Sequence, residues 1–128
     1  MRIQLPDINI LIAIHNSKHL HHDIATEWFE TEGRHGRATC PLTENGFTRI
    51  FTQSQYLNSL QGVSSALFLL QNMVKAYSTT HHFWPDNVSM CDGTLFTPSA
   101  IEGRKQITDI YLLGLYNHNG GNFGDFRH

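Results

Sequence analysis

The sequence has little that would tie it to a membrane or to a disulfide framework. Cys40 and Cys91 are the only cysteines among 128 residues, so a disulfide-rich secreted scaffold is excluded and free thiols are expected. The apolar run Ile10–Ile14 is far shorter than the roughly 20 residues of a membrane span. Asp7 and Asn9 stand just before that run and also make it a poor signal peptide. These features predict a cytoplasmic protein with no membrane segment.

The sequence also lacks an excess of positive charge. Lys and Arg number 9 and Asp and Glu number 11, which gives a formal net charge of −2. A general polyanion binder is therefore excluded, because affinity for phosphates depends on clustered cations. Any attraction to nucleic acid has to be local or has to come from a bound metal ion.

The remaining composition is that of a globular protein. Apolar residues make up 40% and charged residues 16% of the chain, which excludes a disordered or collagen-like chain. A chain of this length buries enough surface for one sound core. We therefore expect a single domain over residues 1–128.

Short apolar stretches alternate with longer segments of helical periodicity. Strands are predicted at 1–5, 37–40, 83–84 and 122–126, and helices at 8–14, 21–30, 42–51, 63–77 and 108–118. This alternation is typical of an α/β domain with a mainly parallel sheet flanked by helices. In such domains ligands bind beyond the carboxyl ends of the strands, where the next helices begin.

Three carboxylates lie at predicted helix starts: Asp7, Glu44 and Asp109, the last just after Thr108 as a candidate N-cap. Acids in these positions are ordinarily capping residues that interact with the helix dipole. If all three met at one sheet edge, their mutual repulsion would destabilise the fold, by about 1 kcal/mol for two charges 4 Å apart in water. A hard divalent cation would relieve that repulsion, and oxygen ligands suit Mg²⁺ or Mn²⁺.

At these acids the sequence resembles PIN-domain ribonucleases, and most closely the VapC-type toxins of toxin–antitoxin pairs. The matching stretches follow the order of the family and span nearly the whole chain. They are LPDINILIAI (5–14), HLHHDIATEWFE (19–30), ATCPLTENGFTRIF (38–51), FWPDNVSMCD (83–92) and QITDIYLLGLYNHNGGNF (106–123).

The resemblance implies a PIN-like three-layer sandwich and metal-dependent hydrolysis of RNA phosphodiester bonds. Asp7, Glu44 and Asp109 become the catalytic acids that hold Mg²⁺ or Mn²⁺, while Asn9 and Thr108 become neighbours that hydrogen-bond the acids or the substrate. Arg104 is the expected cation for a substrate phosphate. The partners that the resemblance implies are an RNA substrate, with tRNA as one candidate, a VapB-like antitoxin and a second copy of the chain in a homodimer.

The last predicted strand departs from the family pattern. The family carries a fourth Asp directly after an aromatic residue, whereas here Phe126 is followed by Arg127. Asp125 lies two residues before that position, and residues i and i+2 of a strand share a face. Asp125 is therefore the candidate fourth metal ligand. The alternative is a catalytically weakened PIN-like protein that binds antitoxin or RNA without cleavage.

Other conspicuous residues favour structural interpretations. The histidines at 15, 19, 21 and 22 have spacings that could bind zinc, but a solvated surface is the favoured interpretation, as it is for His81 and His82. Trp28, Phe29, Phe47 and Phe51 could stack on bases, but their helical spacing favours core packing. Cys40 is expected to be a buried free thiol, because nothing in the sequence places a His base beside it.

Overall fold

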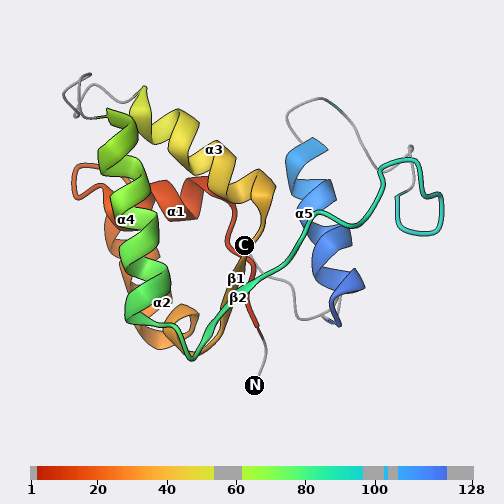
Figure 1. The fold of residues 1–128 in the computed structure, drawn as a ribbon, viewed down its shortest axis with the longest axis horizontal. Coiled ribbons are helices and arrows are strands. Elements are labelled where there is room, and N and C mark those ends of the chain that lie inside the picture. Colours follow the sequence, from red (N-terminus) through yellow and green to blue (C-terminus); the bar gives the residue numbers. More distant parts are fainter. Residues whose placement is uncertain (1–2, 54–61, 97–102, 104–106, 121–128) are drawn as a thin grey trace. The chain divides into compact units, whose positions relative to one another are not determined.

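The structure is a computed structural model that describes residues 3–53, 62–96, 103 and 107–120 (Figure 1). The chain divides into two compact units, Met1–Trp84 and Pro85–His128, and each is described by itself. The described elements of the first unit are α1 (Ile8–His15), α2 (His22–Thr31), the 3₁₀ turn η1 (Gly33–His35), β1 (Arg37–Thr39), α3 (Pro41–Thr52), α4 (Gly62–Ala76) and β2 (His81–Phe83). The second unit contains α5 (Ile107–His118).

The strands β1 and β2 pair in parallel, as the alternation of strands and helices predicted. Arg37 lies opposite His81 and Thr39 lies opposite Phe83. The predicted strand at 1–5 is reduced to a parallel bridge between Gln4 and Arg37 in the described part of that segment. The α/β class with a parallel sheet is confirmed. The predicted strand at 122–126 lies outside the described residues, and the single domain remains a prediction.

The first residues of α1 and α3 explain why each helix begins where it does. Asp7 is the N-cap of α1, and its Oδ1 accepts a hydrogen bond from the backbone N–H of Ile10 at 2.9 Å. Pro41 is the first residue of α3, a position at which its missing N–H has no cost. The backbone N–H of Cys40 donates to Oγ1 of Thr43 at 3.0 Å and so closes the first turn. Both predicted helix starts are confirmed.

The four helices of the first unit enclose one apolar core. In Figure 1, α1 lies against both α2 and α3, and α3 packs along α4. Three of the aromatic residues that the sequence assigned to the core, Phe29, Phe47 and Phe51, are buried, and Trp28 packs against them. The other buried members of the core are Leu11, Ile12, Ala66, Leu70 and Met73.

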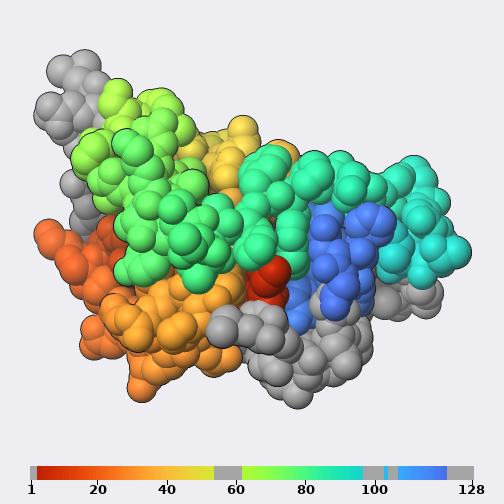
Figure 2. Space-filling view, turned by 60° about the horizontal axis from the view of Figure 1, so that its bottom comes forward, coloured from red at the N-terminus to blue at the C-terminus, as the bar shows by residue number. Residues whose placement is uncertain are grey.

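Arg37 of β1 is fully buried and contacts the segment that directly follows α4. Its guanidinium lies over the rings of both Tyr77 and Phe29, 4.9 Å and 5.5 Å from their centres, and these two rings contact each other edge to face. The same guanidinium donates to the carbonyls of Gly33 and Tyr77 and to Oγ1 of Thr80. Figure 2 shows the resulting neighbourhood from outside, with the green surface that follows α4 beside the orange surface of η1.

In the second unit, Phe96 packs against α5 at a glycine. Gly114 leaves room for the ring of Phe96, which would lie 2.6 Å from a Cβ at that position. The ring of Phe96 also stacks on Tyr111, and the Tyr111 hydroxyl donates to Asp86 at 3.0 Å. The predicted helix at 108–118 is confirmed, but α5 already begins at Ile107, so Thr108 lies inside its first turn and is not the N-cap. Of the helices described here, none is long and apolar enough to cross a membrane.

Candidate functional site

Asp7 lies where the chain leaves the bridge at Gln4 and enters α1. It is half-buried, and one carboxylate oxygen accepts the capping hydrogen bond from Ile10. The positive end of the α1 dipole lies at the same place and interacts favourably with a negative charge there. The second oxygen has no hydrogen bond within the described ranges and is therefore left for a cation or a water molecule.

Glu44 lies in the first turn of α3 and is also half-buried. Its Oε2 accepts a hydrogen bond from the hydroxyl of Thr39, at 2.6 Å. Thr39 is the last residue of β1 and is fully buried, so the strand end and the helix start hold the carboxylate between them. The other oxygen of Glu44 has no partner among the residues that the structure describes.

A glycine brings the two helix starts together. Gly46 of α3 lies so close to Ile8 of α1 that an added Cβ would be 2.8 Å from Cγ1 of Ile8 and closer still to its Cδ1. Asp7 directly precedes Ile8, and Glu44 lies two residues before Gly46. The contact therefore places both residues near the same junction of α1 and α3, and their joint role in a metal site remains a prediction.

The remaining predicted site residues are Asn9 beside Asp7 and four residues of the second unit. Asn9 is exposed in the first turn of α1. Asp109 is exposed and Thr108 half-buried, both in the first turn of α5, within the second unit. Arg104 and Asp125 lie outside the described residues. The convergence of Asp109 on Asp7 and Glu44 remains a prediction.

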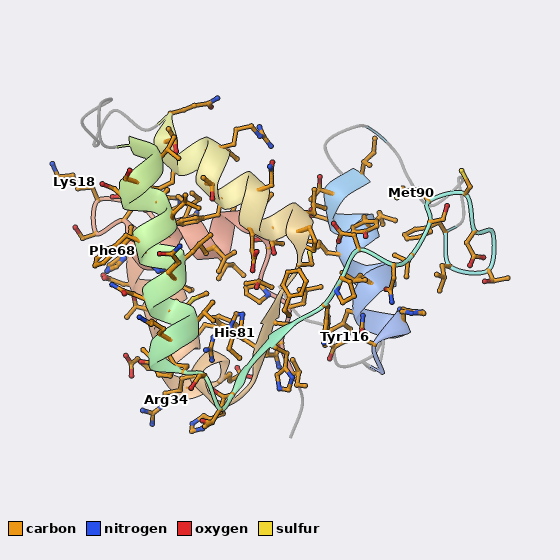
Figure 3. All side chains as sticks on the ribbon, in the orientation of Figure 1. Lys18, Arg34, Phe68, His81, Met90 and Tyr116 are labelled. Carbon is orange, nitrogen blue, oxygen red and sulfur yellow. The ribbon has the colours of Figure 1, made fainter. Side chains whose placement is uncertain are left out.

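A histidine that the sequence placed on the surface is part of this site. His81 is the first residue of β2 and is half-buried, and Figure 3 shows it on the side of the strands toward α4. Its Nε2 lies 3.1 Å from Oγ1 of Thr39. Because the hydroxyl of Thr39 gives its one proton to Glu44, Nε2 of His81 must be the protonated nitrogen that donates to Thr39.

Burial keeps His81 neutral. Loss of solvation, with smaller contributions from the positive charge of Arg37 and from His82, lowers the pKa of His81 to about 4. The geometry agrees, because Nδ1 of His81 is buried and has no hydrogen-bond partner in the part of the chain that is described. A second proton on the ring would place an unpaired N–H beside the guanidinium of Arg37. The surface interpretation of His81 was therefore wrong.

Sequence reasoning missed both Thr39 and His81. A usable signal existed for Thr39, since it is the polar residue of a short buried strand that ends directly before the Cys40–Pro41 helix start. No comparable signal marked His81, because the predicted strand began at Phe83, two residues after the observed start.

The other histidines form no zinc site. In the described ranges, no group of three or more His, Cys, Asp or Glu side chains is arranged to hold a metal ion. Nδ1 of His22 lies 2.7 Å from the carbonyl of Ala13, and Nδ1 of His15 lies 2.9 Å from that of Leu11, so each ring donates to backbone. Cys40 is a buried free thiol, as expected, and Cys91 is an exposed one.

The donor set at the α1–α3 junction fits a hard cation better than a soft one. Asp7 and Glu44 contribute carboxylate oxygens, and in each acid one oxygen is fixed by a hydrogen bond while the other has no partner in the part of the chain that the structure describes. No ion pair with Lys, Arg or His neutralises either acid within the described residues. Two half-buried carboxylates of like charge repel each other, and oxygen-preferring Mg²⁺ or Mn²⁺ would offset that repulsion.

Comparison with known proteins gives consistent relatives over almost the whole chain. Ribonuclease VapC44 of Mycobacterium tuberculosis is 34% identical over 122 residues, which cover 95% of this chain and 84% of the relative. Ribonuclease VapC39 of the same organism is 31% identical over 122 residues, covering 95% and 86% of the two chains. Ribonuclease VapC38 is 37% identical over 116 residues, covering 91% and 79%. No family model and no solved structure matches.

Proposed function

The chain belongs to the VapC ribonucleases, and from this membership we propose that it is an endoribonuclease that hydrolyses RNA phosphodiester bonds as the toxin of a toxin–antitoxin pair. The observation that carries the proposal is the junction of α1 and α3, where Ile8 against Gly46 brings Asp7 and Glu44 together in a chain of this family. No feature of the described residues favours the alternative of a binding protein without cleavage.

The proposed site consists of Asp7, Glu44 and Asp109, with Asp125 as a further candidate. Asp7 and Asp109 would hold Mg²⁺ or Mn²⁺, and Glu44 would bind the ion through water or orient the attacking water. Supporting observations are the one oxygen each of Asp7 and Glu44 that has no partner among the described residues, and the place of all three acids in first turns or at the cap of helices, where negative charge interacts favourably with the dipole.

Each residue of the proposed site has its own role in the hydrolysis of the phosphodiester. A divalent cation held by these acids would supply a water molecule of lowered pKa and positive charge to offset the negative charge of the phosphoryl group. Glu44, fixed by Thr39, keeps one oxygen to accept a hydrogen bond from the attacking water. Asn9 and Thr108 hydrogen-bond the acids or the substrate, and Arg104 binds a substrate phosphate.

We further propose the partners that follow from the family. A VapB-like antitoxin covers the acidic junction and is expected to present an Arg to it, because no Lys, Arg or His of the described residues forms an ion pair with Asp7 or Glu44. The toxin acts in the cytoplasm, forms a homodimer and takes RNA as substrate, with tRNA among the candidates.

The experiment is metal-dependent cleavage of single-stranded RNA and of tRNA by the full chain, with Asp109→Asn as the matched control. Cleavage that requires Mg²⁺ or Mn²⁺ and is lost in Asp109→Asn supports the proposal. Equal cleavage by both proteins would identify a contaminating nuclease. RNA or antitoxin binding without any cleavage would establish the weakened binding protein instead.

A further inference from the structure

The buried polar groups of the first unit form a short chain of hydrogen bonds that ends at Glu44. His81 donates from Nε2 to Oγ1 of Thr39 at 3.1 Å, and Thr39 donates to Oε2 of Glu44 at 2.6 Å. The three residues come from β2, β1 and α3, so the chain crosses the parallel strand pair before it reaches the helix start. None of this is needed to build the core, which is lined by apolar side chains.

We infer that Thr39 and His81 are positioning residues for Glu44. His81 fixes the direction of the Thr39 hydroxyl, and that hydroxyl holds one oxygen of Glu44 so that the other is presented in a constant orientation. This inference rests on the proposed function, since it assigns Glu44 a role in the reaction.

The direction of each hydrogen bond follows from the proton count. A threonine hydroxyl has a single proton, and a carboxylate has none to give, so the proton between Thr39 and Glu44 belongs to Thr39. The lone pair of Thr39 then accepts from His81, which requires the tautomer protonated at Nε2. Every member of the chain thus has one allowed arrangement, and a hydroxyl with one arrangement holds its acceptor more firmly than one that rotates.

The surroundings hold His81 in that form. Its Nδ1 is buried without a partner in the described part of the chain, and Arg37 lies opposite it in the strand register. The guanidinium of Arg37 is itself fixed by Gly33, Tyr77 and Thr80, so it cannot turn away. A ring proton on Nδ1 would be both unpaired and next to this charge. The neutral ring with its proton on Nε2 is therefore the form that the fold selects.

The short distance to Glu44 also matters. An O–H···O⁻ bond of 2.6 Å lies in the range of charge-assisted hydrogen bonds, which are stronger than neutral ones. Thr39 is fully buried, so water does not compete for its hydroxyl. Removing a residue that orients the ligands of a metal site typically lowers metal affinity or activity by about 10- to 100-fold.

The test replaces each group by a variant that lacks the hydrogen bond and by one that retains it. Thr39→Val keeps the shape of the side chain but loses the hydroxyl, whereas Thr39→Ser keeps the hydroxyl. His81→Leu loses the donor, whereas His81→Gln places an amide N–H where Nε2 was. Thr31→Val is the matched control, because it also removes a threonine hydroxyl, one that donates to the backbone carbonyl of Glu27 at an exposed position on α2.

The measurements are kcat and KM for a cleavable RNA at saturating Mg²⁺, together with the melting temperature of each variant. We expect Thr39→Val and His81→Leu to lower kcat by about 10-fold or more with little change in KM, while Thr39→Ser and His81→Gln recover most of the loss. In a Glu44→Gln background, Thr39→Val should cause no further loss of kcat, because it acts through Glu44.

The outcomes separate this inference from the proposed function. If the wild type cleaves RNA and Thr39→Val and His81→Leu are as active as Thr31→Val, the positioning roles are refuted and the ribonuclease remains. If Thr39→Ser is as impaired as Thr39→Val, the hydroxyl is not the cause, which also refutes them. If the wild type does not cleave, the proposed function fails first. Should Thr39→Val not fold, the His81→Leu and His81→Gln pair decides the question alone.

Discussion

Asp7 carries two roles that one pair of substitutions separates. It caps α1 through the 2.9 Å hydrogen bond from Ile10, and it is a proposed ligand of the divalent cation. Asp7→Ala removes both the cap and the charge. Asp7→Asn keeps a good capping side chain, because Asn accepts the same backbone hydrogen bond, but removes the charge.

Typical values for caps, helix dipoles and charge pairs set the expected size of each effect. Loss of an N-cap costs about 1 kcal/mol, which lowers Tm by about 4 °C for a chain of this length. Asp7→Asn loses about 0.3–1 kcal/mol of interaction with the helix dipole. It also relieves repulsion from Glu44, which at a separation of 4 Å in water would be about 1 kcal/mol. The two terms oppose each other, so the metal-free Asn variant should melt close to or slightly above the wild type.

The assay is thermal unfolding with and without Mn²⁺, together with RNA cleavage. We expect Mn²⁺ to raise the Tm of the wild type but of neither variant, and we expect both variants to lose cleavage. A metal-free Asp7→Asn protein that melts as low as Asp7→Ala would refute the capping argument. An undiminished Mn²⁺ shift in Asp7→Asn would refute the assignment of Asp7 to the metal site.

Two further predictions concern the packing and the titration of the site. Gly46→Ala should destabilise the fold by about 1–3 kcal/mol through overpacking against Ile8, less about 1 kcal/mol gained in helix propensity. In urea unfolding, the double variant Gly46→Ala with Ile8→Ala should lose less stability than the sum of the losses in the two single variants. The pKa of His81 is lowered to about 4 in the folded chain, against 6.5 in the unfolded chain. Between these two pH values the unfolded chain therefore binds more protons than the folded chain. The free energy of unfolding should fall as the pH is lowered from 6.5 to 4. His81→Gln should flatten that fall in part, leaving the contribution of His15, whose pKa burial also lowers; an unchanged slope would show that His81 is protonated equally in both states.

Local signals in the sequence located most of the helices. Asp7 before an apolar run and Pro41 after a short strand are start signals whose chemistry is complete within a few residues, and both helices begin there. The two carboxylates at these starts followed from the same signals. The start of α5 was predicted one residue too late, because Thr108 is a typical N-cap residue but here lies inside the first turn.

The parts of the site that the sequence did not reveal depend on contacts between distant segments. Thr39 and His81 are 42 positions apart, and only the parallel register of β1 and β2 places them within 3.1 Å. The pKa of His81 is lowered mainly by its burial and, to a smaller extent, by the charge of Arg37, a residue type that is ordinarily exposed. Arg37 instead lies over the rings of Phe29 and Tyr77, and this arrangement exists only in the folded chain.

The most direct test of the account is the affinity of the full chain for Mn²⁺, measured by isothermal titration calorimetry. We compare the wild type with Asp7→Asn, Asp109→Asn and the double variant. If both acids bind the same ion, each single change weakens binding by tenfold or more, which corresponds to about 1.4 kcal/mol, and the double change adds little. Wild-type affinity in Asp109→Asn would contradict the account, since the acid of α5 would then have no share in the site at the start of α1.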